Sequence, residues 1–465
     1  MRKTGIFAIS QVVRLLKQAF PGLNSFALVV LILLTGLSAC HRSARGLDNY
    51  PAEGNPVQND DEFLEMVQRK GFDFFWEAYN PETGLILECL KINAALLGPD
   101  HWQNNRAGLT SVGFGLSAYC IADERGWKDH DEIYKRVLKL LNAFIKDPDN
   151  ENDFCVAGTH GFFYHMFDIN TGKRWGEWQV STTGSAILMA GVLHAMEHFK
   201  GTEIETLADQ IYRNAEWDWF LTEKGSVSAG WKPENPGKGI YGDYRMYNEY
   251  VTVYLLGMGS PTHPLPRESW DVWNSGPGVT PVKPYKDIPA FHAPAGFPLA
   301  YLYQFPACWF DFRGKKDKYG IDYWAMGINA LKSNRRHCQE WAKKENDNTS
   351  WGWNACEGRD DYLGFVRPYD GTISPSAVAG AIPYFPEVAI ADLRDLYERY
   401  QDEAFLKCGF VESFNPYQSW YNDGYLGLDQ GNLVIMIENY RTGLVWEETM
   451  RSPYVQTGMK QAGFK

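Results

Sequence analysis

From residue 60 onward the chain repeats one pattern: an amphipathic helical segment, a connection rich in Gly, Pro or Asp, and another helical segment. Apolar residues recur at helical spacing behind Asp60, a favourable helix N-cap, so the first helix is predicted to begin there. Further helices are predicted over residues 108–123, 129–146, 181–199, 203–220, 246–258, 319–344, 387–400, 429–440 and 452–462. Because no detachable linker interrupts the series, the sequence predicts one all-α domain built as a ring of helix hairpins.

Strand-like alternation is scarce in the same part of the chain. Residues 158–168, with the sequence GTHGFFYHMFD, are short and aromatic, and a turn signal follows them. They are predicted to form a small β-hairpin beside the helices. Two long connections, residues 221–245 and 260–295, are full of Trp, Pro and Gly. Long loops in a compact domain usually carry function, so we expect them to be functional.

The charge of the chain limits its partners. Its 465 residues carry a formal net charge of -12, and 45% of them are hydrophobic, which is typical of a globular protein with a buried core. No basic run occurs beyond the first residues. Nucleic-acid binding needs a basic patch that neutralises phosphates, so nucleic acid is not an expected partner.

The beginning of the chain has the features of an export signal. Lys3, Arg14 and Lys17 precede an apolar run at residues 26–39, which is short for a membrane span and ends at Cys40 in Leu-Ser-Ala-Cys. This ending resembles a bacterial lipobox. The resemblance implies cleavage before Cys40 and lipidation of its thiol. An ordinary signal peptide or signal anchor is the alternative.

These features predict the organisation of the whole chain. Residues 1–40 are predicted to be a lipoprotein-type signal peptide, residues 41–59 a flexible tether, and residues 60–465 a single folded domain. The protein is expected to be a monomeric cell-envelope lipoprotein, on the periplasmic face or the outer-membrane surface. It would touch the membrane only through its lipid anchor.

The remaining cysteines and one histidine motif are the residues that bear on metal binding. Eight cysteines less Cys40 leave an odd number, and no CxxC or zinc-type spacing occurs, so we expect mostly buried thiols with at most one or two disulfides. Residues 194–198, HAMEH, match the H-x-x-E-H signature of inverted zinc peptidases. Such sites need a distal Glu and a polar cleft, whereas this helix presents a core face at Ile187, Leu188 and Leu193. Neither a metal nor another cofactor is therefore predicted.

Aromatic residues are unusually frequent, at 15%, and many of the 17 Trp and 26 Tyr stand next to Gly, Asn or Asp. Their rings combine a flat apolar face with a polar tip, which suits them to stacking on sugar rings. The alternative is that they are large core residues. The stacking candidates are Trp175, Trp178, Trp231, Trp351 and Trp353.

Glu249 is the first candidate for a catalytic group. It lies between Tyr247, Asn248 and Tyr250, at the beginning of an apolar helical run. A carboxyl group at the edge of an aromatic pocket has its pKa raised by desolvation, as a general acid requires. The alternative is a carboxylate that only stabilises the start of a helix through the helix dipole.

Several stretches resemble the bacterial glucoamylase-like family that includes the endo-β-1,2-glucanases of glycoside hydrolase family 144. The resemblance covers essentially all of residues 60–465, and its specificity lies in the order and spacing of the motifs. It implies an (α/α)6 toroid, a sugar cleft at its mouth, and hydrolysis with inversion at the anomeric carbon. The matching motifs are GFFYH at 161–165, TGKR at 171–174, ST at 181–182, AILMAG at 186–191, YNEY at 247–250, GSPTHP at 259–264, WFDFRGKKDKYGIDYW at 309–324, DGTISPSA at 370–377 and DQGNLVIMIENYRTGLVW at 429–446.

Two positions depart from the pattern of this family. The family carries an acidic residue two positions before the Ser-Thr pair and an Asp shortly after it, where this chain has Gln179 and Gly184. Gln cannot act as an acid or a base. Inverting hydrolysis needs two carboxyl groups about 6.5–9.5 Å apart, so the partner of Glu249 stays open. The candidates are Glu177, which lies near the family position, Asp168, Glu357, Asp360 and Asp370.

Together these observations predict a glycoside hydrolase with Glu249, Glu177 and Asp168 as catalytic candidates. The resemblance favours a β-1,2-glucan-like substrate, and oligo- or polysaccharide is the expected partner. The alternative is a surface glycan-binding protein that keeps the toroid but has lost a catalytic carboxylate. Glu438 and Asn439 either carry structure or line the floor of the cleft. The predicted substrate-binding residues are Trp175, Gln179, Trp231, Tyr247, Asn248, Trp351, Trp353 and Glu357.

Overall fold

Two kinds of helix alternate along the chain, and their burial distinguishes them. In α7 (His130–Asn142) the buried residues are Ile133, Val137, Leu140 and Leu141, which form one stripe of an amphipathic helix. Helix α8 (Thr182–His198) is buried on all sides. A helix that is apolar all round has neighbours all round, so α8 belongs to an inner layer and α7 to an outer one.

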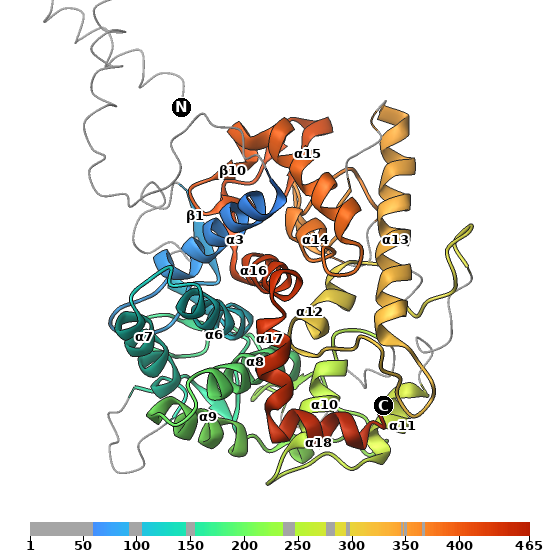
Figure 1. Cartoon of the computed structure of the whole chain (residues 1–465). Coiled ribbons are helices and arrows are strands. Elements are labelled where there is room, and N and C mark those ends of the chain that lie inside the picture. Colours follow the sequence, from blue (N-terminus) through green and yellow to red (C-terminus); the bar gives the residue numbers. More distant parts are fainter. Residues whose placement is uncertain are drawn as a thin grey trace, which may run out of the picture. The chain divides into compact units, whose positions relative to one another are not determined.

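The computed structural model describes residues 59–92, 105–145, 154–235, 247–275, 284–293, 298–345, 347, 351–364 and 368–465. The inner helices are α6 (Leu109–Glu124), α8, α10 (Val251–Gly259), α12 (Tyr301–Trp309), α14 (Pro375–Ala379) and α16 (Gly427–Arg441). Outer helices include α3 (Asp60–Glu77), α7, α9 (Glu203–Arg213), α13 (Tyr323–Ala342), α15 (Pro386–Ala404) and α18 (Pro453–Gln461). Helix α16 packs against α3, α6, α12 and α14, which surround it in Figure 1. This is the predicted all-α toroid of inner and outer helices.

The inner helices run in the same direction. At their beginnings, Tyr250 lies 3.4 Å from Thr182 between the hydroxyl oxygens, and the Ser376 hydroxyl donates to Asp429. A Cβ on Gly184 at the start of α8 would lie 3.3 Å from Leu109 at the start of α6, and one on Gly427 at the start of α16 would lie 2.2 Å from Ser111 of α6. Gln304 in the first turn of α12 donates to the Ala377 carbonyl of α14 at 2.7 Å. All six therefore begin at one end of the ring, called here the amino end, and finish at the other, the carboxyl end.

Short antiparallel strand pairs fill the connections between the helices. The predicted hairpin at residues 158–168 is present, although the segment also supplies a strand that pairs elsewhere. The pairs are β1 (Cys89–Lys91) with β14 (Gly424–Leu426), β2 (Arg106–Gly108) with β5 (Met166–Asp168), β3 (Gly158–Thr159) with β4 (Phe162–Phe163), β6 (Val180–Ser181) with β7 (Gly230–Trp231), β8 (Cys356–Glu357) with β9 (Tyr362–Leu363), β10 (Phe405–Leu406) with β11 (Gly409–Phe410), and β12 (Phe414–Asn415) with β13 (Trp420–Tyr421).

Among the described residues, four helices were not predicted from the sequence: α11 (Glu268–Asn274), α12, α14 and α17 (Leu444–Arg451). Helix α12 contains Pro306, and α14 has only 5 residues, so neither shows a clear helical period. The predicted helix 203–220 ends at Arg213 and continues only as a 3-10 turn at Trp217–Phe220. The predicted helix 246–258 begins later, at Val251.

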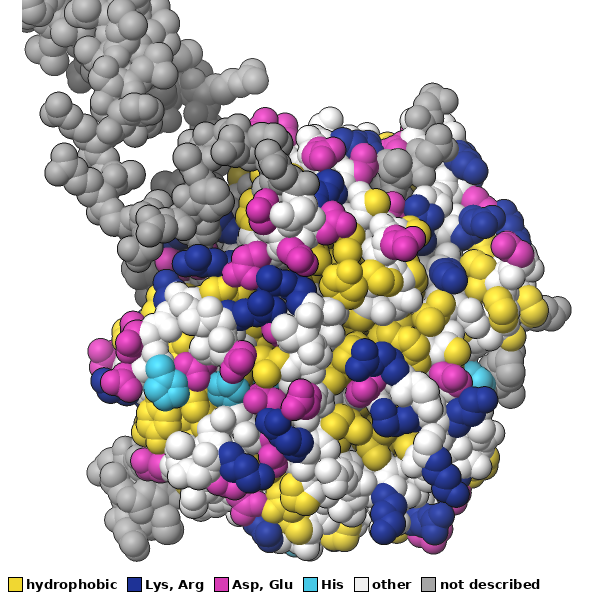
Figure 2. All heavy atoms as spheres, viewed as in Figure 1, with side chains coloured by type: hydrophobic (Ala, Val, Ile, Leu, Met, Phe, Trp, Pro, Cys, Tyr) yellow, Lys and Arg dark blue, Asp and Glu magenta, His cyan; other side chains and the backbone are white. Residues whose placement is uncertain are grey.

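All seven cysteines in the described part of the chain are free thiols, and six of them are buried. None of the described helices is long and apolar enough to cross a membrane. Cys40 and the predicted tether up to residue 58 lie outside the described residues. On the face shown in Figure 2, basic and acidic side chains are interspersed. That face presents no continuous basic area of the kind that binds phosphates.

Candidate active site

Glu249 lies immediately before α10, at the amino end of the ring. The loop is held by the Asn248 side chain, which accepts a hydrogen bond from the Tyr250 backbone N–H at 3.1 Å, and by the Glu249 carbonyl, which accepts one from Thr252 at 3.1 Å. The glutamate is only partly exposed. Burial raises the pKa of Glu249 to about 7, and no other charged side chain contributes to that shift. The group is thus a carboxyl that keeps its proton near neutral pH.

Three further carboxyl groups are buried at the same end of the ring, and the sequence did not single them out. Glu88 precedes β1, Glu412 lies between β11 and β12, and Asp429 stands in the first turn of α16. Burial is the main cause that raises the pKa of each one. Buried carboxyl groups with raised pKa values are frequent at functional sites.

The hydrogen bonds of these three groups differ. Glu88 accepts one from the Ser111 hydroxyl at 2.6 Å. Glu412 accepts one on each oxygen, from the Glu357 backbone N–H at 2.9 Å and from the Asn422 amide at 3.2 Å. Asp429 accepts one on Oδ1, from Ser376, whereas its buried Oδ2 has no hydrogen-bond partner. Asp429 therefore has an oxygen that remains available to a ligand or to water.

The four groups Glu88, Glu357, Glu412 and Asp429 are called here the acidic cluster. The negative charge of Asp429 raises the pKa of Glu412, after the larger effect of burial, and Glu88 acts on Asp429 in the same way. Lys91 supplies the opposing positive charge, 3.5 Å from Glu357 and 3.0 Å from the side-chain oxygen of Asn422. Like charges so close cannot all ionise together, so part of the acidic cluster stays protonated.

The carboxylates predicted as partners of Glu249 lie in different settings. Asp168 uses Oδ1 to accept hydrogen bonds from the backbone N–H groups of Asn170 and Thr171, both at 2.9 Å, which is an Asx-type turn. Glu177 lies in an exposed loop just before β6. Asp370 accepts a bond from the Thr372 backbone N–H at 2.9 Å, again within a turn, while Glu357 belongs to the acidic cluster. Exposed Asp360 pairs with neighbouring Arg359 at 3.3 Å.

The predicted stacking tryptophans divide into buried and accessible rings. Trp351 is 0% exposed and its indole donates to Asp392 at 2.7 Å, so its ring is a core element out of reach of a sugar. Trp353 is also buried and stacks on His337 with ring centroids 5.0 Å apart. Trp175 and Trp231 are partly exposed, and Trp178 is 38% exposed.

The two positions that depart from the family pattern lie next to His165, a residue missed from the sequence. The Gln179 carbonyl accepts a hydrogen bond from the His165 backbone N–H at 2.8 Å. A Cβ on Gly184 would lie 3.0 Å from His165 Nδ1, a buried atom without a hydrogen-bond partner. Burial lowers the pKa of His165 to about 4, so its imidazole is neutral at neutral pH. A side chain longer than glycine at residue 184 would press against this ring.

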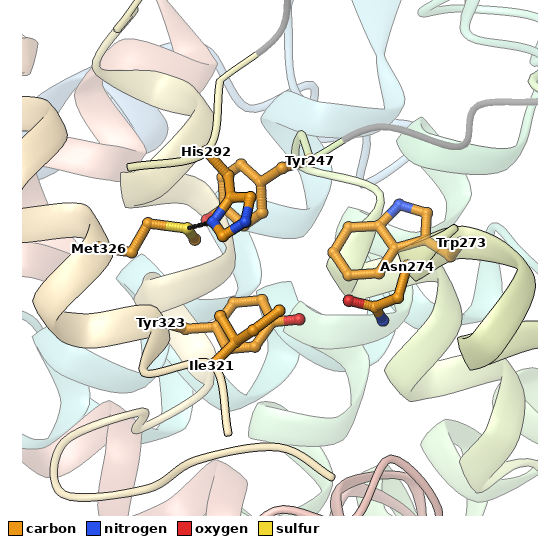
Figure 3. A pocket seen from close by; sticks show the side chains of 7 residues that line it. All are labelled: Tyr247, Trp273, Asn274, His292, Ile321, Tyr323 and Met326. Atoms are coloured by element: carbon orange, nitrogen blue, oxygen red, sulfur yellow. Dashed lines mark hydrogen bonds between the residues drawn. The ribbon is translucent and has the colours of Figure 1, made fainter. Parts of the chain in front are cut away.

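Tyr247 belongs to an aromatic hollow rather than to an open surface. Figure 3 shows its ring grouped with Trp273, Tyr323 and His292 around a gap that has no room for a water molecule. Tyr247 is buried and stacks on Tyr303, with ring centroids 5.1 Å apart. These packed rings hold Tyr247 in place, and with it the loop that carries Asn248 and Glu249.

The H-x-x-E-H motif lies at the other end of α8, near the carboxyl end of the ring. His194 and His198 both bind the same oxygen of Glu448, at 3.1 and 3.0 Å, and His198 also binds Asp123 at 3.1 Å. The motif is thus part of a hydrogen-bonded network. Within the described ranges, no group of three or more metal-ligating side chains converges on a common point.

Of the acidic cluster only Glu357 was a candidate from its own sequence context, and the other three carboxyl groups could not be found by such signals. Asp429 is the first residue of a motif quoted for the family resemblance, which was its only signal. Glu88 and Glu412 stand in no motif, and they meet Asp429 only because the strands β1 and β14 and the start of α16 come together.

Comparisons with known proteins agree with this fold. The Glycoamylase family model matches residues 242–453. An exo-β-1,2-glucooligosaccharide sophorohydrolase from Parabacteroides distasonis is 25% identical in an alignment of 447 positions that covers 86% of this chain and 58% of that protein. The chain thus spans just over half the length of that relative.

Two solved structures cover nearly the whole of their own chains. A glucoamylase-like protein from Bacteroides uniformis has a TM-score of 0.79 and 28% identity over 88% of this chain and 99% of its own. An endo-β-1,2-glucanase from Chitinophaga pinensis has a TM-score of 0.78 and 26% identity over the same shares, 88% and 99%. The resemblance predicted from the motifs is confirmed: the chain is similar to the glucoamylase-like family, whose model matches residues 242–453.

Proposed function

We propose that this protein is a glycoside hydrolase that cleaves a β-1,2-linked glucan or a related glucooligosaccharide. The observation that carries the proposal is Glu249, whose pKa is raised to about 7 at the end of the ring where the acidic cluster is also buried. The β-1,2-glucan hydrolases among its relatives support the choice of substrate.

Glu249 is the proposed general acid. Hydrolysis of a glycosidic bond requires a carboxyl group that donates its proton to the departing oxygen. Burial raises the pKa of Glu249 to about 7, so a large fraction of the enzyme carries that proton at neutral pH. The aromatic rings packed around Tyr247 hold the loop that carries Glu249 in place, so the orientation of its carboxyl group is fixed.

Asp429 is the proposed general base. Its Oδ1 is fixed by Ser376 and its Oδ2 has no partner, so one oxygen is oriented and the other is available to a water molecule. Burial and the charge of Asp429 raise the pKa of Glu412 well above its usual range. Glu412 thus keeps the proton, and Asp429, whose own pKa burial raises to about 7, is the member of the pair that ionises near neutral pH. Water activated by Asp429 would attack the anomeric carbon while Glu249 protonates the leaving oxygen, which inverts the configuration.

The experiment compares the wild type with Glu249→Gln on β-1,2-, α-1,4- and mixed-linkage glucans, measured as reducing ends released. We expect hydrolysis of the β-1,2-linked substrate and a loss of about 10²- to 10⁴-fold in kcat for the variant, the usual contribution of a general acid. Glu447→Gln, on the exposed outer side of α17, serves as the matched control. Near-normal turnover by Glu249→Gln would contradict the assignment, and proton NMR of the first product shows whether the anomer is inverted.

A glycan-binding protein without hydrolysis is the second candidate, and Gln179 and Gly184 favour it because acidic residues are replaced there. The same glucan panel separates the two functions when binding is measured by titration calorimetry. Release of reducing ends means an enzyme, whereas affinity without release means a binder.

Export and lipid anchoring are also proposed, from residues 26–39 and Cys40. Labelled palmitate should be incorporated into the wild type and not into Cys40→Ala, and the variant should move from the membrane fraction to the soluble fraction. Equal labelling of both forms would contradict the anchor.

A further inference from the structure

Few large apolar side chains are exposed in the described part of the chain, and two aromatic ones lie at the amino end of the ring. Trp178 precedes β6 and α8 and is 38% exposed, and Tyr362 on β9 is 51% exposed. Trp178 was a stacking candidate already. Tyr362 has no role in the site as described so far.

Tyr362 lies directly opposite Glu357 in the two-stranded pair of β8 and β9. Side chains of directly opposed residues stand on the same face of a sheet, with Cβ atoms about 4.5–5.5 Å apart. The Glu357 side chain reaches Lys91, at 3.5 Å, and accepts a hydrogen bond from Asn422 at 3.2 Å. The Tyr362 ring therefore stands on the face of the hairpin that is turned toward the acidic cluster.

The hairpin is fastened to the acidic cluster by its backbone. The Glu357 N–H donates to Glu412 at 2.9 Å, and the Ser413 hydroxyl donates to the Glu357 carbonyl at 2.6 Å. Burial and the charges of Glu412 and Asp429 raise the pKa of Tyr362. The hydroxyl end of the side chain is thus near the carboxyl groups, while about half of its surface still meets solvent.

The order of the inner helices places the acidic cluster between the two exposed rings. The hairpin of Tyr362 is tied to the start of α16, α16 packs on α6, and α6 packs on α8, which Trp178 precedes. Helix α10, with Glu249 before it, packs on the other side of α8. A sugar chain that reaches from Tyr362 to Trp178 would pass the acidic cluster.

We propose that Tyr362 is the platform of a pyranose-binding subsite beside the acidic cluster, on which one sugar ring of the substrate stacks. This inference rests on the proposed hydrolase function. The flat apolar face of tyrosine matches the C–H face of a pyranose, and its exposed surface leaves room for one ring. The fixed backbone of the hairpin holds the platform in place before the substrate arrives, which limits the entropy lost on binding.

The test measures kcat and KM on β-1,2-linked glucooligosaccharides for the wild type, Tyr362→Ala and Tyr362→Phe. We expect Tyr362→Ala to raise KM roughly tenfold, as the loss of one aromatic contact would, with a much smaller change in kcat. Tyr362→Phe keeps the ring and should stay within about twofold of the wild type. Tyr319→Ala removes a tyrosine of similar exposure, 52%, whose hydroxyl donates to Asp271 in α11, and should leave both constants unchanged.

A binding arm separates the subsite from the hydrolase function. The dissociation constant of the same oligosaccharides is measured by calorimetry with Glu249→Gln alone and with Glu249→Gln combined with Tyr362→Ala, and thermal melting confirms that each variant is folded. Weaker binding in the double variant supports the subsite even when the wild type releases no reducing ends, in which case only the hydrolase function fails. A KM and a dissociation constant within twofold of the reference, or no binding by either form, would overturn the subsite.

Discussion

Helix α16 carries one carboxyl group near each end, and the two have opposite surroundings. Glu438, near the carboxyl end, binds Arg125 through two nitrogens at 3.0 Å each and accepts further hydrogen bonds from Gln68 at 2.7 Å and Thr442 at 2.6 Å. Asp429, near the amino end, has a single bond from Ser376 and one oxygen without a partner. Both are buried, so pairing rather than burial separates a structural carboxylate from a functional candidate.

The ring as a whole repeats the same contrast. At its carboxyl end, burial alone would raise the pKa of Glu448, but hydrogen bonds from His194 and His198 hold that pKa well below its usual range. The pKa of Asp123 is also lowered by its histidine partners in spite of burial. At the amino end, burial raises the pKa values of Glu88 and Asp429. The carboxyl end of the ring therefore stabilises its ionised carboxylates, whereas at the amino end ionised carboxylates destabilise the fold when no ligand is bound.

The largest expected effect comes from removing the charge of Asp429. We expect Asp429→Asn to lower kcat about 10³-fold, the typical contribution of a general base, while the melting temperature stays the same or rises because one buried charge is gone. Steady-state kinetics and thermal melting measure the two effects. A much lower melting temperature with a normal kcat would show that Asp429 is a structural carboxylate like Glu438.

The matched change at the other end of α16 should have the opposite profile. Glu438→Gln leaves the Arg125 guanidinium without its carboxylate, so we expect the free energy of unfolding in urea to fall by about 3 kcal/mol. The kcat of the folded fraction should stay near the wild-type value, because Glu438 touches no part of the candidate site. If kcat fell as much as in Asp429→Asn, the two ends would not differ in role.

The pH dependence of activity tests the raised pKa of Glu249. A general acid works in its protonated form, so with a pKa of about 7 its contribution is present below pH 7. We expect kcat/KM to fall about tenfold per pH unit above that value. Initial rates from pH 5 to 9 on a β-1,2-linked substrate, with the enzyme checked for folding at each pH, give the measurement. A profile that stays flat to pH 9 would remove Glu249 as the acid.

The pH dependence of stability tests the network at the carboxyl end. Although burial opposes the charge, Asp123 and Glu448 raise the pKa of His198 to about 9, above its unfolded value. The stabilisation is therefore fully present below about pH 6.5 and is lost as the pH rises through about 9; we expect a loss of about 3 kcal/mol. His198→Gln should remove this slope in urea unfolding experiments. An unchanged slope would show that another group controls it.

Much of the helical framework follows from local periodicity. The helices α3, α6, α7, α8, α13, α15, α16 and α18 all lie where the sequence predicts them. In α3, α7, α13, α15 and α18 the apolar residues keep a helical period, whereas α6, α8 and α16 are buried on most sides and are long runs of 16, 17 and 15 residues. Helix α12 was not predicted because it has only 9 residues and Pro306 interrupts them. Helix α14 is too short to show a period.

A residue of the candidate site could be predicted only where its neighbours in the sequence also surround it in the fold. Glu249 could be singled out because the aromatic residues beside it in the chain are also its surroundings in the fold. Trp178 and Trp351 have similar sequence contexts, yet one is exposed and the other fully buried. Their difference depends on Asp392, a residue far along the chain that binds the Trp351 indole.

The sequence by itself determined the all-α ring and the resemblance to the glucoamylase-like family, and it singled out Glu249 as a candidate, because helical period and motif order are carried by consecutive residues. Only the tertiary structure decided which carboxyl groups are buried away from water without a basic side chain to pair with them. The pKa of a group depends on the side chains that surround it, and those of Asp429 come from β1, α14 and the segment before β12. Packing brought Glu88, Glu412 and Asp429 together, and packing left Glu438 paired at the other end of the same helix.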